Sequence, residues 1–575
     1  MRRLAALLVL AFPVFANIST SSLTGRVIIG GAPATGVTIT ATSSALQQQR
    51  ATITNASGRY WLGALPPGTY DVTFSLAGHT TLTRRAVLEL ARVARADATL
   101  EPNPDEDSTT STATTVSVAD TIAITSHFDD HMLDRMPQGR IGTASLAPGA
   151  HFNYLPIVDG MATSGFVTSE ETIEQITFVR GAPPVEWDTF VGTAIPARTR
   201  SGGEEFFFTL RDTITSDDND DLLHFGEATV GGRVVPQRLW FFAAGWTGEQ
   251  DYPFRQEPRG MMIKLDAQIG DAHHFDASYN DTEQGSGIEP FKSDTASLRY
   301  TAAIGPRFTS EVVAGRTTIG LGSLYEASTE YFSGRASYSL GDHLLTAGVS
   351  AQDSDAPDSR SLFASDRWSF SRWNVYAGLR YDDGQFDERL APRIALTYDL
   401  RGDGRRALSA SWGEYASAAQ PQFALRTTTL GYATAIGNSG AARIDVLRRE
   451  NGDFWMNELQ LDARYRLFDR FEAGATYTFV DQYESGFQQP AYPEHAAHVW
   501  AGAELPIGSH EFGVTLLQHY LEFADSIYPT DLALRYSIPF SRLGLMIAAD
   551  ATNVLDSDQS YQAPRAVRFW VRVRM

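Results

Sequence analysis

The chain ends in nine residues that alternate between two chemistries: Val567-Arg568-Phe569-Trp570-Val571-Arg572-Val573-Arg574-Met575. Side chains of an extended strand alternate between two faces, so the valines, Phe569 and Met575 share one face, and the arginines and Trp570 share the other. A single strand of this kind fits a soluble sandwich with its arginines in water. It fits equally a membrane barrel with its arginines in a wet lumen, so the preceding residues must decide.

Tight turns recur roughly every 34 residues from Gly203 to the C-terminus, which is the kind of internal period that marks a repeated unit. Between successive turns lie a run of about ten residues, a longer polar loop and a second run that returns. The turns are Val235–Arg238, Ile269–Asp271, Ile304–Pro306, Leu340–Asp342, Phe370–Arg372, Arg401–Gly404, Gly437–Gly440, Phe468–Arg470, Ile507–Ser509 and Phe540–Arg542.

The longer loops are acidic, and they alternate with the tight turns along the chain. Together the turns and loops predict roughly 22 strands, an even number, with short turns on one edge of the sheet and acidic loops on the other. The clearest loops are Asp217–Asp221, Gly248–Arg259, Asn280–Asp294, Asp353–Arg360, Asp382–Arg389, Arg448–Asn457, Asp481–Glu494 and Asp556–Arg565.

This unbroken series favours one closed barrel over several sandwiches, whose strands are shorter and whose connections are less uniform. Tilted strands of about ten residues match the hydrocarbon core of a bilayer. Closure is required there because an open sheet edge in lipid leaves N–H and C=O groups unpaired. We therefore predict an all-β protein in which residues 203–575 form a transmembrane antiparallel β-barrel.

Composition agrees with this prediction and excludes other classes. The mean hydropathy of −0.20 is low for a helical membrane protein, but it is expected where only every second strand residue meets lipid. The absence of cysteine excludes disulfides, thiolate metal sites and an N-terminal lipid on cysteine. The net charge of −21 argues against a nucleic-acid partner, and we interpret it as solvation of exposed loops.

The N-terminal part of the chain divides into four segments. Residues 1–16 have a basic start and an apolar run ending in small residues, which predicts a secretory signal cleaved after Ala16. Residues 17–102 contain short strand-like runs split by Gly, Pro and Asn, which predicts a small β-sandwich. Residues 103–115 are rich in Pro, Asp, Ser and Thr and predict a linker. Residues 116–202 change character again.

The predicted sandwich resembles a known module. Thr24-Gly25-Arg26-Val27, the segment Thr54–Tyr60 and the segment Leu65–Val72 are similar to the carboxypeptidase regulatory-like domain, a transthyretin-type sandwich. No zinc-ligand constellation accompanies the motifs, so the resemblance implies no peptidase activity. We interpret His79 as an ordinary loop residue.

The segment 116–202 resembles the plug domain of TonB-dependent outer-membrane receptors. The Oar-like branch of that family carries the same sandwich in front. Thr552–Asp556 and the closing strand resemble the C-terminal signature of the family. The motifs that carry the plug resemblance are Leu133–Arg140, Leu146–Gly149, Val158–Gly160, Ile173–Pro183 and Thr199–Glu204.

Three departures from the family are visible. The stretch between Gly149 and Val158 is short, so the plug is reduced. The glycine pair before the last plug strand is replaced by Val191-Gly192. Met575 stands where the family has a terminal aromatic residue that the barrel assembly machinery reads.

The resemblance implies an importer. Such a receptor sits in the outer membrane with its sandwich in the periplasm, in contact with outer-membrane lipid, and binds a scarce extracellular substrate. An inner-membrane energy transducer of the TonB type would grip Val116, Ser117, Val118 and Ala119 and displace the plug. From the residues alone, this extended apolar segment is as well explained as the first strand of the next domain, or as a strand that pairs with a partner's sheet edge.

The alternative is a structural or adhesive barrel with a permanent plug. An enzyme is the least favoured class, because no nucleophile elbow, P-loop or His-Glu-x-x-His is present. His127 and His131 stand beside Asp129 and Asp130, but they lack a third ligand within range, and we interpret them as solvated residues. We therefore predict no catalytic residues, no cofactor and no metal, and we assign no substrate-binding residue.

Overall fold

The computed structural model describes most of the chain outside the first 19 residues. The described ranges are 20–43, 45–46, 49–88, 93–103, 111–114, 124–137, 154–162, 169–181, 184–187, 193–216, 222–251, 255–285, 290–321, 325–355, 358–384, 388–417, 420–437, 439–451, 454–467, 470–484, 494–522, 526–540, 543–555 and 566–575. No helix among these residues is both long and apolar enough to cross a membrane.

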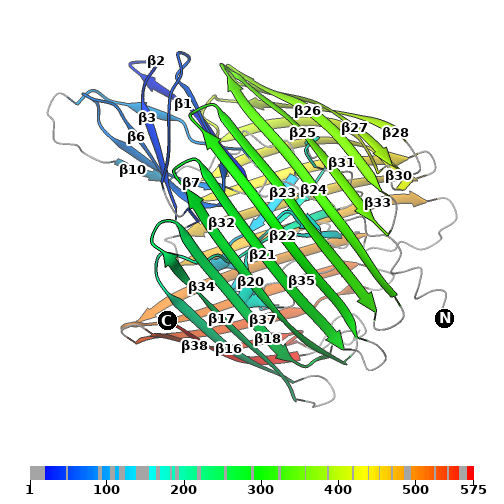
Figure 1. The fold of residues 1–575 in the computed structure, drawn as a ribbon. Helices are drawn as coiled ribbons and strands as arrows, with labels where there is room; N and C mark the ends of the chain where they lie inside the picture. The colour runs from blue at the N-terminus through cyan, green and yellow to red at the C-terminus, as the bar shows by residue number, and fades with distance from the viewer. Residues whose placement is uncertain are drawn as a thin grey trace.

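A closed antiparallel barrel of 22 strands forms the C-terminal body, as predicted (Figure 1). Two short segments, β19 (Gln250–Asp251) and β36 (Ser526–Ile527), add local pairings. The main strands are β16 (Phe207–Ser216), β17 (Leu222–Val235), β18 (Leu239–Gly248), β20 (Arg255–Ile269), β21 (His273–Gly285), β22 (Phe291–Ile304), β23 (Phe308–Leu321), β24 (Tyr325–Leu340), β25 (His343–Ser354), β26 (Ser359–Phe370), β27 (Trp373–Gly384), β28 (Glu388–Asp399), β29 (Arg406–Ser417), β30 (Gln420–Ile436), β31 (Gly440–Asn451), β32 (Phe454–Leu467), β33 (Phe471–Glu484), β34 (His495–Ile507), β35 (His510–Glu522), β37 (Thr530–Phe540), β38 (Leu543–Thr552) and β39 (Ala566–Arg574).

The first and last strands close the cylinder. β16 pairs with β39 in antiparallel register from Thr209, opposite Arg574, to Ser216, opposite Val567. Each neighbouring strand pair follows the chain order, so every connection is a hairpin. The wall therefore has no open edge, which is the condition for a sheet in hydrocarbon.

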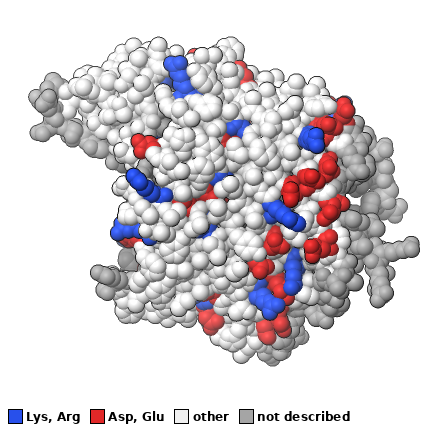
Figure 2. All heavy atoms as spheres, in the orientation of Figure 1, with Lys and Arg blue, Asp and Glu red and all other residues white. Residues whose placement is uncertain are grey.

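The two faces of the wall differ as the alternation of the last strand predicts. Phe569 and Val571 are 57% and 43% exposed, whereas Trp570 and Arg572 are 3% and 6% exposed and point into the lumen. On the face shown in Figure 2, most Asp and Glu lie toward the end away from the sandwich, and a broad band with few charges crosses the wall. This band is the surface that would meet lipid.

The strands are longer than the predicted ten residues. β24 has 16 residues and β30 has 17. The predicted loop Asn280–Asp294 is mostly strand, because β21 continues to Gly285 and β22 begins at Phe291. Polar and acidic side chains do not interrupt an antiparallel ladder, so the hairpins continue beyond the apolar band.

A five-stranded sheet, which we call the inner sheet, occupies the lumen. Its order is β11-β14-β15-β12-β13. Its partners lie on strands from β16 to β39, all around the wall, which places it inside the barrel (Figure 1). It corresponds to the predicted plug. Its elements are β11 (Ile124–Phe128), α2 (Asp130–Leu133), β12 (Tyr154–Val158), β13 (Met161–Ala162), η2 (Glu170–Thr172), β14 (Ile173–Arg180) and β15 (Thr193–Thr199).

The N-terminal residues form a sandwich of two sheets around an apolar core that includes Leu23, Val27, Ile39, Val72 and Phe74, all 0% exposed. One sheet contains β1 (Ser21–Ile29), β2 (Ala32–Pro33), β5 (Arg59–Leu65), β8 (Val93–Arg95) and β9 (Ala98–Leu100). The other has the order β10 (Ser111–Thr114), β7 (Leu82–Leu88), β6 (Gly68–Ser75), β3 (Thr38–Thr42) and β4 (Arg50–Ile53). β10 belongs to the predicted linker, but its backbone pairs with β7 in parallel register and extends the sandwich instead.

The sandwich docks on the short-turn end of the barrel (Figure 1). Arg59 Nε lies 3.1 Å from Asp342 Oδ1, and Asn55 Nδ2 donates to Gly341 O over 3.3 Å, both at the turn between β24 and β25. Arg95 Nη1 lies 3.8 Å from Asp399 Oδ2 at the turn after β28. The sandwich therefore covers part of the short-turn mouth.

The charge-poor band predicts a position-dependent cost for outward-facing arginines. Leu298 is 51% exposed in the middle of β22, and Leu222 is 64% exposed at the loop end of β17. We expect Leu298→Arg to lower the free energy of unfolding by about 2–4 kcal/mol and Leu222→Arg by about 0–1 kcal/mol. Urea-dependent folding into phosphatidylcholine vesicles measures both, and equal costs would contradict a lipid-facing band.

Candidate functional site

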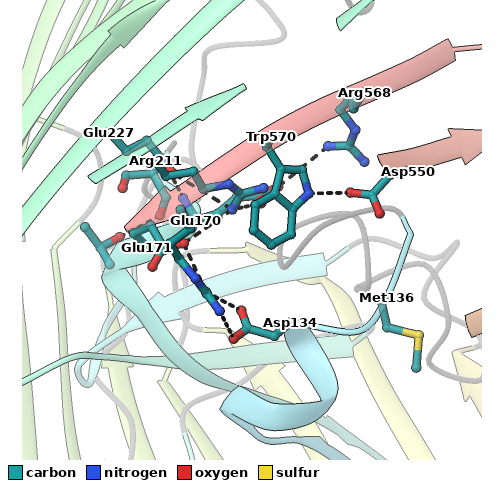
Figure 3. Close-up of polar contacts among 12 residues, drawn as sticks. Asp134, Met136, Glu170, Glu171, Arg211, Glu227, Asp550, Arg568 and Trp570 are labelled. Carbon is teal, nitrogen blue, oxygen red and sulfur yellow. Dashed lines mark hydrogen bonds and ion pairs between the residues drawn. The ribbon is translucent and has the colours of Figure 1, made fainter. Parts of the chain in front are cut away.

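The inner sheet meets the wall where the first and last strands close the barrel. η2 presents Glu170 and Glu171, and β16 presents Arg211. Arg211 Nη1 lies 2.7 Å from Glu170 Oε2 and 3.6 Å from Glu171 Oε1 (Figure 3). Glu227 on β17 accepts the backbone N–H of Glu170 over 2.8 Å. We call this group, with Asp134, Arg568, Trp570 and Arg572, the closure cluster.

The last strand completes the closure cluster. Arg572 binds Asp134 with both terminal nitrogens, at 2.9 and 2.8 Å, a bidentate geometry that fixes direction as well as distance. Arg572 Nη1 also lies 3.3 Å from Glu171 Oε1. Asp134 follows α2 directly, so this pair holds the only α-helix within the described part of the inner sheet against the wall.

Trp570 organises the cations around it. The Arg211 guanidinium lies 4.4 Å from the centre of the Trp570 ring, and that of Arg572 lies at 5.5 Å. The indole Nε1 donates to Asp550 Oδ2 over 2.8 Å (Figure 3). Cation–π contact and the fixed indole keep the guanidinium groups aimed at the carboxylates of the inner sheet.

A second attachment lies on other strands of the wall. We call Pro184–Trp187 the hook. Arg393 on β28 donates to the carbonyls of Pro184 and Trp187, and Arg380 on β27 donates to Val185 O over 3.2 Å. The phenol of Tyr376 accepts the N–H of Val185 over 2.7 Å.

The shape of the wall matches the hook. A Cβ added at Gly378 would approach the methyl groups of Val185 to 2.8 and 2.9 Å, so the absence of a side chain there leaves room for Val185. Glu186 completes the fit by accepting from Ser365 Oγ over 2.9 Å and from Tyr376 Oη over 3.1 Å.

A third attachment centres on Asp159, in the turn between β12 and β13. Lys264 of β20 is fully buried, and its Nζ lies 3.3 Å from Asp159 Oδ2. Burial alone would raise the pKa of Asp159, but Lys264, Arg299 and two hydrogen bonds from Thr199 hold this pKa below its ordinary value. Asp159 therefore stays ionised and keeps its pairing with the wall at neutral pH.

The inner sheet is thus held by ion pairs and hydrogen bonds together with apolar contacts. Phe128 and Leu133 pack near Trp500 and Leu517, Val158 packs near Phe242, and Val185 packs near Phe363. Buried ion pairs contribute little net stability because desolvation offsets their attraction. They specify one position strongly, since a wrong position leaves a buried charge unpaired. Such an interface fixes the position of the inner sheet more than it adds to stability.

The residues that the sequence analysis considered lie in different surroundings. Val116, Ser117, Val118 and Ala119 lie outside the described residues. The four residues near α2 face different partners. His127 Nδ1 bonds Thr177 Oγ1 over 3.1 Å, and Asp129 caps α2 by accepting the N–H of Met132 over 2.9 Å. Asp130 pairs with Arg200, and His131 lies 3.5 Å from Glu504.

Away from α2, one group of side chains in the described part of the chain has a geometry that could hold a metal ion. The ligand atoms of Asp266, His274 and Asp276 lie within 4.8 Å of one another. Arg299 Nε is already 2.6 Å from Asp276, and Lys264 and Arg299 bring two positive charges close by. The protein's own cations therefore compete for this position, and the group does not fit a resident metal well.

The closure cluster and the hook were not anticipated as functional residues. The Glu170-Glu171 pair precedes a strand, and the arginines of β39 alternate with apolar residues, so both features are visible in the sequence. Glu171 and Arg572 are 401 residues apart, however, and no local pattern indicates that they are in contact. The hook had no sequence signal, because its bonds come mostly from backbone atoms.

Comparisons with known proteins agree with this architecture. A family model of the carboxypeptidase regulatory-like domain matches residues 22–101, and one of the TonB dependent receptor-like β-barrel matches residues 197–442. The TonB-dependent transporter Oar of Myxococcus xanthus is 28% identical over 279 residues, which cover 39% of this chain. The match spans 26% of the length of that transporter.

Solved structures share the fold. The siderophore receptor PirA of Pseudomonas aeruginosa superposes with a TM-score of 0.66 at 14% identity, covering 78% of this chain and 99% of that one. BauA, the ferric preacinetobactin receptor of Acinetobacter baumannii, gives a TM-score of 0.64 at 14% identity, covering 79% and 96%.

Removing one cation should loosen the seat of the inner sheet. In Arg211→Ala, Glu170 and Glu227 lose a buried partner, and breaking such a pair costs about 3–5 kcal/mol. We expect the lumen to open at a lower urea concentration, measured as conductance in a planar bilayer.

Arg426→Ala is the matched control, because Arg426 and its partner Glu414 are 63% and 34% exposed on the wall. Its expected cost is at most about 1 kcal/mol. Equal opening midpoints for the two variants would show that the closure cluster does not hold the inner sheet.

Proposed function

We propose that this chain, a TonB-dependent receptor that resembles the Oar-like branch, captures a scarce extracellular substrate and imports it into the periplasm with energy relayed from the inner membrane. The observation that carries the proposal is the filled lumen. The barrel is wide, and its interior is occupied by a separate sheet seated by polar contacts. Passage of a substrate therefore requires that the sheet move.

The connectivity of the inner sheet supports a pull from its N-terminal side. Four residues separate the segment 116–119 from β11 in the sequence, and β11 is an edge strand that pairs with β14 alone among the described residues. Force applied to the segment reaches β11 first, from Ile124 opposite Arg180 to Phe128 opposite Ile176. An edge strand is the part of a sheet that leaves at the lowest cost, because it has hydrogen bonds on one side only. A TonB-type transducer is the proposed partner.

The orientation follows from the two ends of the barrel. Short turns face the periplasm in bacterial barrels, and longer loops face outward. We therefore place the sandwich, which docks at Asp342 and Asp399, in the periplasm. A secretory signal cleaved after Ala16, insertion by the barrel assembly machinery and contact of the charge-poor band with lipid belong to the same proposal.

The substrate class is open to direct screening. PirA is a siderophore receptor and BauA is a ferric preacinetobactin receptor, and ferric siderophores are therefore the first probes for this chain. A vitamin and a set of oligosaccharides extend the screen to other scarce nutrients. No covalent step is part of the proposed function.

Deleting residues 116–119 separates transport from binding. We expect the deletion to abolish energy-dependent uptake of the labelled probe that the intact receptor imports, because it removes the segment that the transducer is proposed to bind. Binding of the same probe to whole cells should stay within about twofold, since the deletion leaves the sequences of the barrel loops and of the inner sheet unchanged.

A deletion of equal length at residues 105–108, in the predicted linker before residues 116–119, controls for a shorter connection between the sandwich and the inner sheet. Uptake that survives loss of 116–119 would remove this segment from the mechanism. Surface binding with no uptake in the intact receptor would favour an adhesive barrel with a permanent plug.

A further inference from the structure

Two cavities lie end to end between the sandwich and the rim of the barrel. The outer one, of about 350 Å³, opens along the seam between β5 and the turns at Pro306 and Asp342. The inner one, of about 50 Å³, lies deeper against the wall. Both are lined by Trp61, Val93, Leu344 and Arg367, so they meet at these side chains.

The inner cavity ends at the hook. Its lining includes Pro184 and Glu186 of the hook and Tyr376, which bonds both Val185 and Glu186. The two cavities therefore form a path from the outer side of the sandwich to the contact between the hook and β27. Release of the hook from the wall would remove the side chains that close the inner end of this path, since Pro184 and Glu186 line it.

Trp61 stands at the narrow point of the path. Its side chain is 8% exposed on the sandwich strand β5 and faces the end of β23. Its indole N–H is buried and has no hydrogen-bond acceptor among the described residues. An unmet buried donor costs about 1–3 kcal/mol, so this position favours either a ligand with an acceptor oxygen or movement of the ring.

The lining carries excess positive charge. Arg59 is neutralised by Asp342 at 3.1 Å, and His343 contacts Asp366 at 2.7 Å. Arg307 and Arg367 have no ion-pair partner in the described part of the chain, although the chain as a whole carries a net charge of −21. Arg367 lines both cavities where they meet, and Arg307 lines the outer cavity, so two guanidinium groups face the path and concentrate anions there. The carboxylate of Glu186, at the inner end, accepts from Ser365 and Tyr376.

We propose that the seam between the sandwich and the rim is the exit route by which an anionic substrate leaves the lumen, with Trp61 as its gate. This inference rests on the proposed function, and it narrows the substrate to compounds with carboxylate, phosphate or similar acidic groups. Arg367 and Arg307 would pass the acid group outward, and the indole N–H of Trp61 would donate to it in transit.

The absence of cysteine permits a direct test. Ser337 lines the inner cavity only, is 8% exposed and is replaced conservatively by cysteine. The full-length Ser337→Cys receptor in detergent is treated with two methanethiosulfonates, one bearing a sulfonate and one a trimethylammonium group. Relative to free cysteine, the anionic reagent should react about tenfold faster than the cationic one.

Further variants identify the route. Arg307→Gln with Arg367→Gln should bring the ratio back toward that of free cysteine. Trp61→Ala should accelerate both reagents several-fold, and Trp61→Phe, which keeps most of the ring, should leave both slow. Ser411→Cys is the matched control, because Ser411 is also 8% exposed in the lumen but lines neither cavity.

Two results would overturn the inference. A ratio at Ser337→Cys that is unchanged by loss of both arginines removes the anionic selectivity. Rates that do not respond to Trp61→Ala, in protein that retains the strand content of the parent by circular dichroism, remove the route. Labelling needs no energy source, so these outcomes are independent of whether deletion of residues 116–119 stops uptake.

Discussion

Pairing of backbone N–H and C=O groups in hydrocarbon is the constraint on which the rest of the structure depends. This pairing is complete only when β16 pairs with β39. The ladder from Thr209–Arg574 to Ser216–Val567 closes the series of hairpins into a cylinder. Closure also fixes the face of each side chain, because a slip of one residue would put Arg572 and Trp570 in lipid.

The same two strands that close the wall also seat its contents. Arg211 comes from the first strand and Arg572 from the last, and both reach Glu171 of the inner sheet. The seat is therefore complete only in a closed barrel, which couples assembly of the wall to capture of the plug. The polar contacts fix the position of the inner sheet and add little net stability, since desolvation cancels much of the strength of each buried pair but not its geometry.

Much of the wall could be predicted from local patterns, because alternation and turn chemistry are properties of neighbouring residues. The final strand and the turn at Gly341 are examples, the latter with the positive φ that glycine permits. The ends of the strands could not be predicted, since a ladder continues through polar residues such as Thr282 opposite Ser293. The contacts that hold the inner sheet could not be predicted either. Glu171 and Arg572 come together only when the barrel closes, and the wall binds the hook through backbone carbonyls of the hook.

The position of the sandwich has a consequence for the opening of the lumen. Pro67 O of the sandwich accepts from Arg198 of β15 over 3.2 Å, while Arg59 and Arg95 bind turns of the rim. The sandwich therefore contacts both the inner sheet and the rim of the barrel. In the proposed transport, withdrawal of the inner sheet would break the first contact and leave the second in place, so the sandwich would remain on the rim. Under that proposal, a sandwich that stays on the rim would leave the seam beside it as the opening, and the charges that line the seam would select which substrates pass.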